Sequence, residues 1–268
     1  RNESYEPLSE AAIEDRLARL NNSDDATWQG DDEHWSLGGQ QAKIAVAFKD
    51  GAWFRCTGAA ATTHIIKPGI SHLKHQALDE YLCLKLATAC SIPSANAEYR
   101  AFGSQPAIVI ARYDRARTPE GNTMRLHQED FCQALGVLPQ NKYPSEGGPS
   151  ARDIVCLLKA NKGAERNVPL FVEMLFFNYL VGAPDAHVKN YSILLGREGR
   201  VALAPLYDVA SGLAYDPPRG GWKLAMGIGQ ETSIGHVRRS NLVRFARNCN
   251  LDADECCTLM ANLAERIS

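Results

Sequence analysis

The sequence lacks the features that would assign it to a membrane, to an oxidising compartment or to nucleic acid by charge alone. Its apolar runs fall short of the roughly 20 consecutive residues that a membrane-spanning helix needs. Its 29 basic side chains nearly balance 31 acidic ones, so the net charge of −2 gives no case for a polyanionic partner. No Cys-x-x-Cys pair occurs among the eight cysteines, and we expect reduced, mostly buried thiols in a cytoplasmic protein with no membrane contact.

Two familiar ligand sites are also missing from the sequence. The phosphate-loop spacing G-x-x-x-x-G-K-[ST] does not occur. His72 and His75 have no third metal ligand at a suitable spacing, so we interpret them as solvated loop histidines. A nucleotide or metal site would therefore have to be built in another way.

The chain does contain a change of pattern, from strand-like segments in its first part to helical segments in its second. Short β-branched and apolar runs bounded by Gly, Pro and Asp come first. Longer apolar stripes at helical spacing follow. This order predicts an α+β fold of two lobes, at 1–112 and 113–268, with a hinge near 111–115.

The individual elements predicted from the sequence follow the same change of pattern. In the first part we expect a helix at 7–20 with Ser9 as its N-cap, a hairpin of 44–48 and 51–55, a strand at 64–67, a helix at 75–90 and a strand at 106–112. The apolar stripe of the 75–90 helix would consist of Leu78, Leu82, Leu86 and Cys90. In the second part we expect helices at 128–135, 169–181, 239–248 and 252–266, and a hairpin of 192–195 and 201–203.

The strongest functional signal follows the apolar segment 169–181. Asp185 and Asn190 have the five-residue spacing of the catalytic Asp and the metal-binding Asn in protein kinases. Asp208 lies beyond the predicted hairpin, where a kinase carries its magnesium-binding Asp. A carboxylate can accept the proton of an incoming hydroxyl, and amide and carboxylate oxygens can hold Mg²⁺. Asp185 is then the base, and Asn190 and Asp208 are the metal ligands; the same three residues could also merely cap turns.

Groups suited to phosphate binding precede these residues in the order that kinases use. Gly38 and Gly39 lie in a turn whose backbone N–H groups can approach phosphate. Lys67 ends a predicted strand and could reach the phosphates of ATP, with Glu80 on the next helix as its ion-pair partner. Alone, Lys67 would be an ordinary surface lysine. What favours a kinase is that all of these residues occur together, in the order along the chain that kinases use.

Together with further strings, these residues resemble the HipA-type toxin kinases over most of the chain. Several uncommon strings in the right order make the resemblance specific. They are SLGGQQAK at 36–43, TTHIIK at 62–67, ARYDR at 111–115, RLHQEDF at 125–131, KY at 142–143, GG at 147–148, DAHVKN at 185–190 and PLYD at 205–208.

The resemblance implies a serine/threonine protein kinase with ATP and Mg²⁺ between the two lobes of a protein-kinase-like fold. It also implies autophosphorylation at Ser36. It assigns ATP binding to several groups of residues. Three of them are a phosphate-covering loop of Gly38, Gly39, Gln40, Gln41, Ala42 and Lys43, the pair of Lys67 and Glu80, and an adenine-side hinge of Ala111, Arg112 and Tyr113. The others are the segment of His187, Val188, Lys189 and Asn190, and then Tyr207 and Asp208.

The resemblance further implies partners. They are a helix-turn-helix antitoxin of the HipB type, operator DNA reached only through that antitoxin, and a protein substrate of the aminoacyl-tRNA synthetase class, whose modification would arrest translation and growth. One departure stands out, because HipA-type proteins carry a small N-terminal subdomain before the stretch seen in this chain. Either the chain is truncated, or a separate small protein supplies that subdomain.

Two other functions fit part of the sequence. The first is a catalytically silent kinase-fold subunit of an antitoxin–DNA repressor complex; Asp185, Asn190, Asp208 and Lys67 argue against it because all four are intact. The second is a small-molecule kinase with a similar fold, which only the family strings exclude. A basic stretch could touch DNA phosphates, although a solvated basic face is the simpler interpretation. Its residues are Arg219, Lys223, Arg238, Arg239, Arg244 and Arg247.

Overall fold

The computed structural model describes residues 3–22 and 41–268 and divides the chain into two compact units. The first unit contains the chain up to Leu82 together with Ala95–Leu126. The second unit contains Cys83–Ser94 and His127–Ser268. The sequence-based division into lobes at residue 112 stays a prediction. No helix among the described residues is long and apolar enough to cross a membrane.

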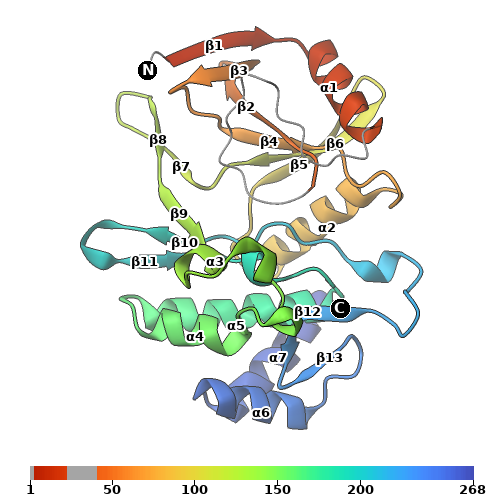
Figure 1. Cartoon of the computed structure of the whole chain (residues 1–268), viewed down its shortest axis with the longest axis vertical. Coiled ribbons are helices and arrows are strands. Elements are labelled where there is room, and N and C mark those ends of the chain that lie inside the picture. Colours follow the sequence, from red (N-terminus) through yellow and green to blue (C-terminus); the bar gives the residue numbers. More distant parts are fainter. Residues whose placement is uncertain (1–2, 23–40) are drawn as a thin grey trace. The chain divides into compact units, whose positions relative to one another are not determined.

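The first unit is built on a six-stranded antiparallel sheet (Figure 1). Asp50 and Gly51 both have positive φ, at 50° and 79°, as a tight two-residue hairpin turn requires, so the hairpin predicted for this segment is confirmed. The strand predicted at 64–67 is confirmed as well. In sheet order the strands are β1 (Glu3–Leu8), β3 (Ala52–Gly58), β2 (Ile44–Lys49), β4 (His64–Lys67), β6 (Gln105–Ala111) and β5 (Ala97–Phe102).

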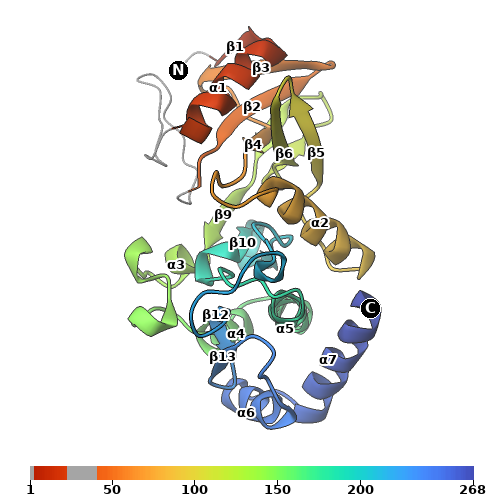
Figure 2. The same cartoon turned by 90° about the vertical axis from the view of Figure 1, so that its right-hand side faces the viewer.

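Helix α1 (Glu10–Asn22) lies along one face of this sheet (Figure 2). Its residues Ile13 and Leu17 are fully buried in a cluster with sheet residues such as Val46. Ser9 begins the helix as predicted, because its Oγ accepts from the N–H of Ala12 at 3.2 Å. The predicted start at residue 7 is wrong: residues 7 and 8 belong to the edge strand β1, where proline is tolerated because one side of the strand needs no hydrogen-bond donor.

Helix α2 (Gln76–Ala89) was predicted correctly in place, and its predicted apolar stripe is confirmed in part, because Cys90 is buried and Leu86 packs against the core. Leu82 of the expected stripe is 54% exposed. The buried positions within the helix are Gln76, Ala77, Glu80, Cys83, Leu84 and Ala87. The helix is therefore turned so that a carboxylate faces inward, which is costly unless that charge has a partner.

The second unit is mainly helical and is centred on α5 (Ala164–Leu180) (Figure 1). Phe171, Phe176 and Phe177 of α5 are fully buried, as its apolar sequence predicts, although the helix begins five residues before the predicted start at 169. Around it lie α4 (Ala151–Lys159), α6 (Arg239–Cys249) and α7 (Ala253–Ile267), and the last two confirm the two helices predicted at the end of the chain.

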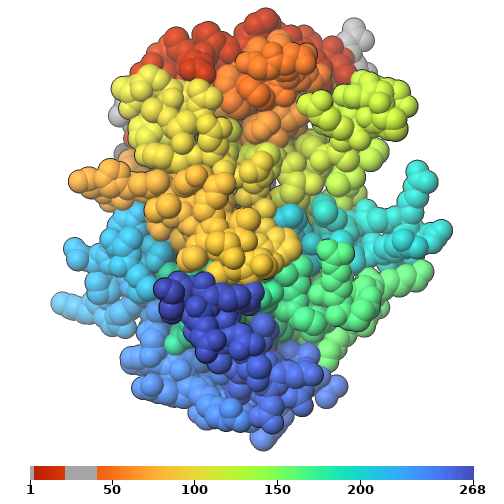
Figure 3. Space-filling model, turned by 180° about the vertical axis from the view of Figure 1, so that it is seen from behind, coloured from red at the N-terminus to blue at the C-terminus, as the bar shows by residue number. Residues whose placement is uncertain are grey.

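Helix α7 packs against the segment that follows α2, as the dark blue and gold surfaces of Figure 3 show. Arg266 of α7 donates to the carbonyl of Cys90 at 2.5 Å and forms an ion pair with Glu173. The end of the described chain is thereby tied to the centre of the unit. All eight cysteines are free thiols, and six of them are buried.

A three-stranded sheet, β11–β10–β9, lies next to the helices of the second unit. Strands β10 (Ser192–Leu195) and β11 (Val201–Leu203) form the predicted hairpin. The helix predicted at 128–135 is largely wrong, because β9 (His127–Asp130) pairs with β10 and only α3 (Phe131–Ala134) is helical. Asp130 ends the strand and caps the helix by accepting from Gln133 N–H at 3.0 Å. The remaining elements are β7 (Arg115–Arg117), β8 (Thr123–Arg125), β12 (Lys223–Ile228), β13 (Glu231–Ser233) and the short 3₁₀ turns η1 (Pro139–Asn141), η2 (Pro144–Glu146), η3 (Val188–Asn190), η4 (Arg197–Gly199) and η5 (Gly212–Ala214).

One buried side chain joins this sheet to α5. The Asn167 amide donates to the carbonyl of Val201 at 2.8 Å and accepts from the N–H of Leu203 at 3.0 Å. Both backbone groups belong to β11, the strand that precedes Asp208. Asn167 therefore fixes the approach of the chain to a candidate metal ligand.

Replacement of Asn167 by Ala is expected to lower the free energy of unfolding by about 3 kcal/mol, because it leaves a buried donor and a buried acceptor without partners. Denaturant-induced unfolding followed by circular dichroism measures the change. Asn122→Ala, at an exposed turn residue, is the control and should change it by less than about 0.5 kcal/mol. Equal stabilities of the two variants would show that Asn167 does not anchor β11.

Candidate active site

The first unit contains a buried ion pair between Lys67 and Glu80. Lys67 is the last residue of β4, and Glu80 lies on the buried face of α2. Their Nζ and Oε1 atoms are 2.8 Å apart, and the two side chains are only 7% and 1% exposed. The ion pair predicted from the sequence is thus present. Because desolvating two charges offsets most of their attraction, a pair buried this deeply suggests a functional role for the lysine more than a stabilising one.

Only part of the predicted phosphate loop is described by the structure. Ser36, Gly38, Gly39 and Gln40 lie outside the described residues. Gln41, Ala42 and Lys43 lead directly into β2. The Gln41 side chain donates to Gln76 Oε1 at 3.1 Å, and Gln76 is the first residue of α2. The end of the loop is therefore connected to the helix that carries Glu80.

The residues predicted to form the adenine-side hinge already use much of their hydrogen-bonding capacity. The N–H of Ala111 donates to Asn96 at 2.8 Å, and that of Arg112 to Thr63 at 2.9 Å. Any adenine contact made by the backbone of these two residues would have to use their carbonyls. Tyr113 follows them directly in the chain.

The Arg112 side chain is also hydrogen-bonded. It donates two hydrogen bonds to the Asp114 carboxylate, of 3.0 and 2.7 Å, and Arg115 donates a third at 2.8 Å. Burial raises the pKa of Asp114, but the hydrogen bonds and charges of the two arginines outweigh it and hold that pKa below its ordinary value. Arg112 is thus a structural ion-pair partner in this unit.

The second unit brings together the three residues predicted to be catalytic. The Asn190 side-chain amide donates to the backbone carbonyl of Asp185 at 3.0 Å and to that of Asp208 at 3.2 Å. Both amide N–H groups are then used, which leaves Asn190 Oδ1 as an acceptor. Asn190 is buried, whereas Asp185 is exposed. An exposed carboxylate suits a base that must meet a macromolecular hydroxyl.

Asp208 has an unusual backbone conformation. Its φ of 58° lies in the left-handed region, where residues other than glycine are uncommon and active-site residues are over-represented. Neighbouring contacts hold it there, because the Tyr207 hydroxyl donates to the Lys189 carbonyl at 2.7 Å and lies 2.6 Å from Ser192 Oγ. Tyr207, predicted to line the ATP site, thus ties the Asp208 segment to the 185–190 loop.

The remaining residues of the 185–190 loop are buried or paired. Val188 is fully buried, and the Lys189 ammonium lies 2.5 Å from an Asp130 carboxylate oxygen. His187 is 7% exposed, and its backbone N–H donates to the Asp185 carbonyl at 2.8 Å. Burial is the main reason that the pKa of His187 is lowered, so its imidazole is neutral at physiological pH.

The donor set fits magnesium and does not fit a metal held by protein ligands alone. Among the described residues there is no group of three or more His, Cys, Asp or Glu side chains that could bind a metal ion. Mg²⁺ commonly takes one or two protein oxygens and completes its shell with phosphate oxygens and water. Asn190 Oδ1 and the Asp208 carboxylate are oxygens of the required kind.

Comparison with known proteins agrees with this arrangement. The model of the HipA-like C-terminal domain matches residues 35–268. The chain belongs to the HipA-like family. It is 38% identical over 217 residues to Y4mE of Sinorhizobium fredii, which is named as a candidate kinase, covering 81% of this chain and 51% of Y4mE. It is 27% identical over 245 residues to the serine/threonine-protein kinase toxin HipA of Shewanella oneidensis, covering 87% of this chain and 55% of HipA.

The fold agrees as well. The solved Shewanella oneidensis HipA, in its complex with HipB and operator DNA, matches with a TM-score of 0.84 at 24% identity, covering 98% of this chain and 63% of that one. This establishes the mixed α+β fold, with an antiparallel sheet followed by a helical part. The chain spans about half the length of the curated HipA-like relatives it matches.

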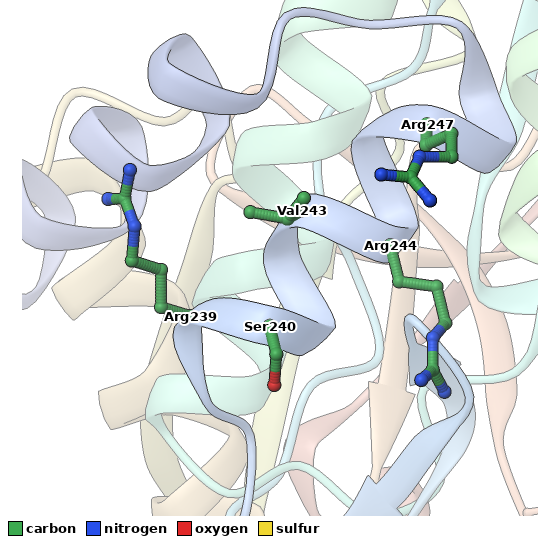
Figure 4. A pocket seen from close by; sticks show the side chains of 5 residues that line it. All are labelled: Arg239, Ser240, Val243, Arg244 and Arg247. Carbon is green, nitrogen blue, oxygen red and sulfur yellow. The ribbon is translucent and has the colours of Figure 1, made fainter.

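The basic stretch predicted near the end of the chain lies partly on α6, around an open depression of about 450 Å³ (Figure 4). Arg239 points away from Arg244 and Arg247. Arg239 is paired with Asp254 at 2.9 Å, and Arg244 donates to Gln230 at 3.1 Å. The guanidinium groups therefore do not converge on one small anion.

Tyr143, a residue to which the sequence assigns no role, contacts the 185–190 loop. The Tyr143 hydroxyl donates to Asp185 Oδ1 at 2.8 Å. Residues 142–143 were noted only as one of the strings that carry the resemblance. A contact between residues 42 positions apart has no local signal in the sequence.

Replacement of Glu80 by Gln is expected to lower the free energy of unfolding by about 3 kcal/mol, because it removes the carboxylate charge 2.8 Å from the buried Lys67 ammonium. It should also weaken ATP binding, since Lys67 is no longer held in place. The control is Asp254→Asn, which breaks the exposed pair with Arg239 and should cost at most about 0.5 kcal/mol. Thermal and denaturant unfolding compare the two variants, and a change in Glu80→Gln as small as that in the control would contradict the role given to the pair.

Proposed function

We propose that this chain is a serine/threonine protein kinase of the HipA type, which transfers the γ-phosphate of ATP to a hydroxyl group of another protein. The observation that carries the proposal is the Asn190 amide, which joins the backbones of Asp185 and Asp208. It places a candidate base and two candidate metal ligands within one hydrogen-bonded group. The buried Lys67–Glu80 pair supports the same chemistry in the other unit.

The roles follow from the chemistry of each side chain. Asp185 orients the incoming hydroxyl and accepts its proton. Asn190 and Asp208 hold Mg²⁺, which neutralises charge on the phosphates when it is bound. Lys67 binds the α- and β-phosphates, and Glu80 fixes its position. The division into two lobes, at 1–112 and 113–268, is part of this proposal.

The other predicted ATP contacts complete the proposal. Backbone N–H groups of the loop from Gly38 to Lys43 would cover the phosphates, the hinge at 111–113 would lie beside adenine, and His187 would line the phosphate site. Phosphorylation of Ser36, before this loop, would add a charge of about −1.5 to −2 where the loop must approach the phosphates of ATP. The modified kinase would therefore be less active, which would make it self-limiting.

The partners are proposed from family membership. We expect a HipB-type helix-turn-helix antitoxin, with DNA contacted through that complex, in the cytoplasm. A separate small protein could supply the N-terminal subdomain of the longer relatives. An aminoacyl-tRNA synthetase is the candidate substrate, and its phosphorylation would arrest translation and growth. The alternative of a catalytically silent subunit is less favoured because Lys67, Asp185, Asn190 and Asp208 are all in place.

Incubation with γ-labelled ATP, magnesium and a cell lysate tests the activity. We expect labelled serine or threonine on a discrete acceptor protein, which mass spectrometry would identify. Asp185→Asn should lower transfer by about 10³-fold or more, because an amide cannot accept the proton, while ATP binding stays largely intact. Asp254→Asn, the same chemical change at an exposed position, should leave transfer unchanged. Transfer by Asp185→Asn at nearly the wild-type rate would refute the assignment.

A further inference from the structure

Tyr143 lies in a short segment that is fixed by its own backbone. The 3₁₀ turns η1 and η2 flank it, and each begins with a proline. The N–H of Gly148 donates back to the Tyr143 carbonyl at 2.9 Å. A Cβ at Gly148 would lie 2.1 Å from the carbonyl oxygen of Asn141, so no other residue fits there without a shift. The segment therefore presents the Tyr143 ring in a defined place.

The ring is also held by contacts with neighbouring side chains. It packs edge-on against the His187 imidazole, with ring centroids 5.3 Å apart at an angle of 73°. The Lys142 ammonium lies 5.0 Å from its centroid. His187 is itself bonded through its N–H to the Asp185 carbonyl, at 2.8 Å. Tyr143 thus contacts both the backbone-anchored part of the catalytic loop and its carboxylate.

The hydrogen bond to Asp185 has a fixed direction. Burial, and then the hydrogen bond and charge of Asp185, raise the pKa of the Tyr143 phenol well above its ordinary value. The phenol therefore stays protonated and always donates to Asp185 Oδ1, at 2.8 Å. A carboxylate with one oxygen held by a donor cannot rotate freely, which directs the other oxygen, Oδ2, to the incoming hydroxyl.

We propose that Tyr143 is a positioning residue for the catalytic base: its hydroxyl holds Asp185 Oδ1 so that Oδ2 faces the hydroxyl of the protein substrate. The inference rests on the proposed kinase function and extends it to a residue outside the loops that hold ATP and magnesium. Because the Tyr143 hydroxyl contacts the base, its removal should affect the transfer step, while the ring stays against His187 and nucleotide binding is unchanged.

Replacement of Tyr143 by Phe removes the hydroxyl and keeps the ring against His187. We expect kcat for transfer from ATP to dephosphorylated casein to fall about tenfold, as for the loss of one hydrogen bond to a charged group, with the KM for ATP unchanged. The matched control is Tyr5→Phe, which removes a hydroxyl bonded to the Ala61 N–H at 3.2 Å and should leave kcat unchanged. Para-aminophenylalanine at position 143 restores a donor at the same place and should recover most of the rate.

A double variant separates positioning from a general structural role. In an Asp185→Asn background, Tyr143→Phe should lower the residual rate no further, because the group on which it acts is already absent. An unchanged or raised kcat in Tyr143→Phe, or a further tenfold loss in the double variant, overturns the inference. If Asp185→Asn itself retains wild-type transfer, the proposed kinase function fails, whatever the result at Tyr143.

Discussion

The side-chain amide of Asn190 is the contact on which the candidate active site depends. It donates to the carbonyls of Asp185 and Asp208, which are 23 residues apart in the sequence and enclose the β10–β11 hairpin. A single side chain therefore bridges the two backbones directly. Its use of both N–H groups also decides the direction of Oδ1. Asn190 thus holds the backbones of the candidate base and of the other candidate metal ligand, Asp208, in a common arrangement.

The surrounding packing supports this arrangement. Asn167 fixes β11 to the buried helix α5, and Tyr207 fixes the segment after β11 to the 185–190 loop. The left-handed conformation of Asp208 is sustained by these contacts. The first unit also contains a buried polar pair, Lys67 and Glu80. Burying two charges costs desolvation free energy, so such a pair is better explained by ligand binding than by stability. Both units place polar groups where stability alone would favour apolar ones.

Local pattern was a good guide to some of these elements and a poor guide to others. The turn at Asp50 and Gly51 and the helices α6 and α7 were predictable, because turn chemistry and helical periodicity determine them within a few residues. Strand β9 was missed because it exists only through pairing with β10, more than 60 residues later. In α2, Leu82 of the predicted stripe is exposed, because the buried face of the helix includes Ala77, Leu84 and the paired Glu80 in its place.

The candidate site likewise has features that the sequence predicts and features that it does not. The spacing of Asp185 and Asn190 and the order of the family strings are local features, and the candidate catalytic residues were predicted from them. The Tyr143 contact with Asp185, the pairing of Lys189 with Asp130 and the engagement of Arg112 by Asp114 could not be predicted, because each depends on how distant or adjacent side chains orient in the folded chain.

The proposed function is tested most directly at Lys67, which should contact the phosphates of bound ATP. ATP carrying a reactive acyl group on its terminal phosphate acylates amines that lie against the phosphates, and mass spectrometry locates the modified lysine. We predict magnesium-dependent labelling of Lys67 that unmodified ATP suppresses. Labelling spread over exposed lysines such as Lys74 and Lys223 without protection by ATP, with Lys67 left unmodified, would contradict this assignment.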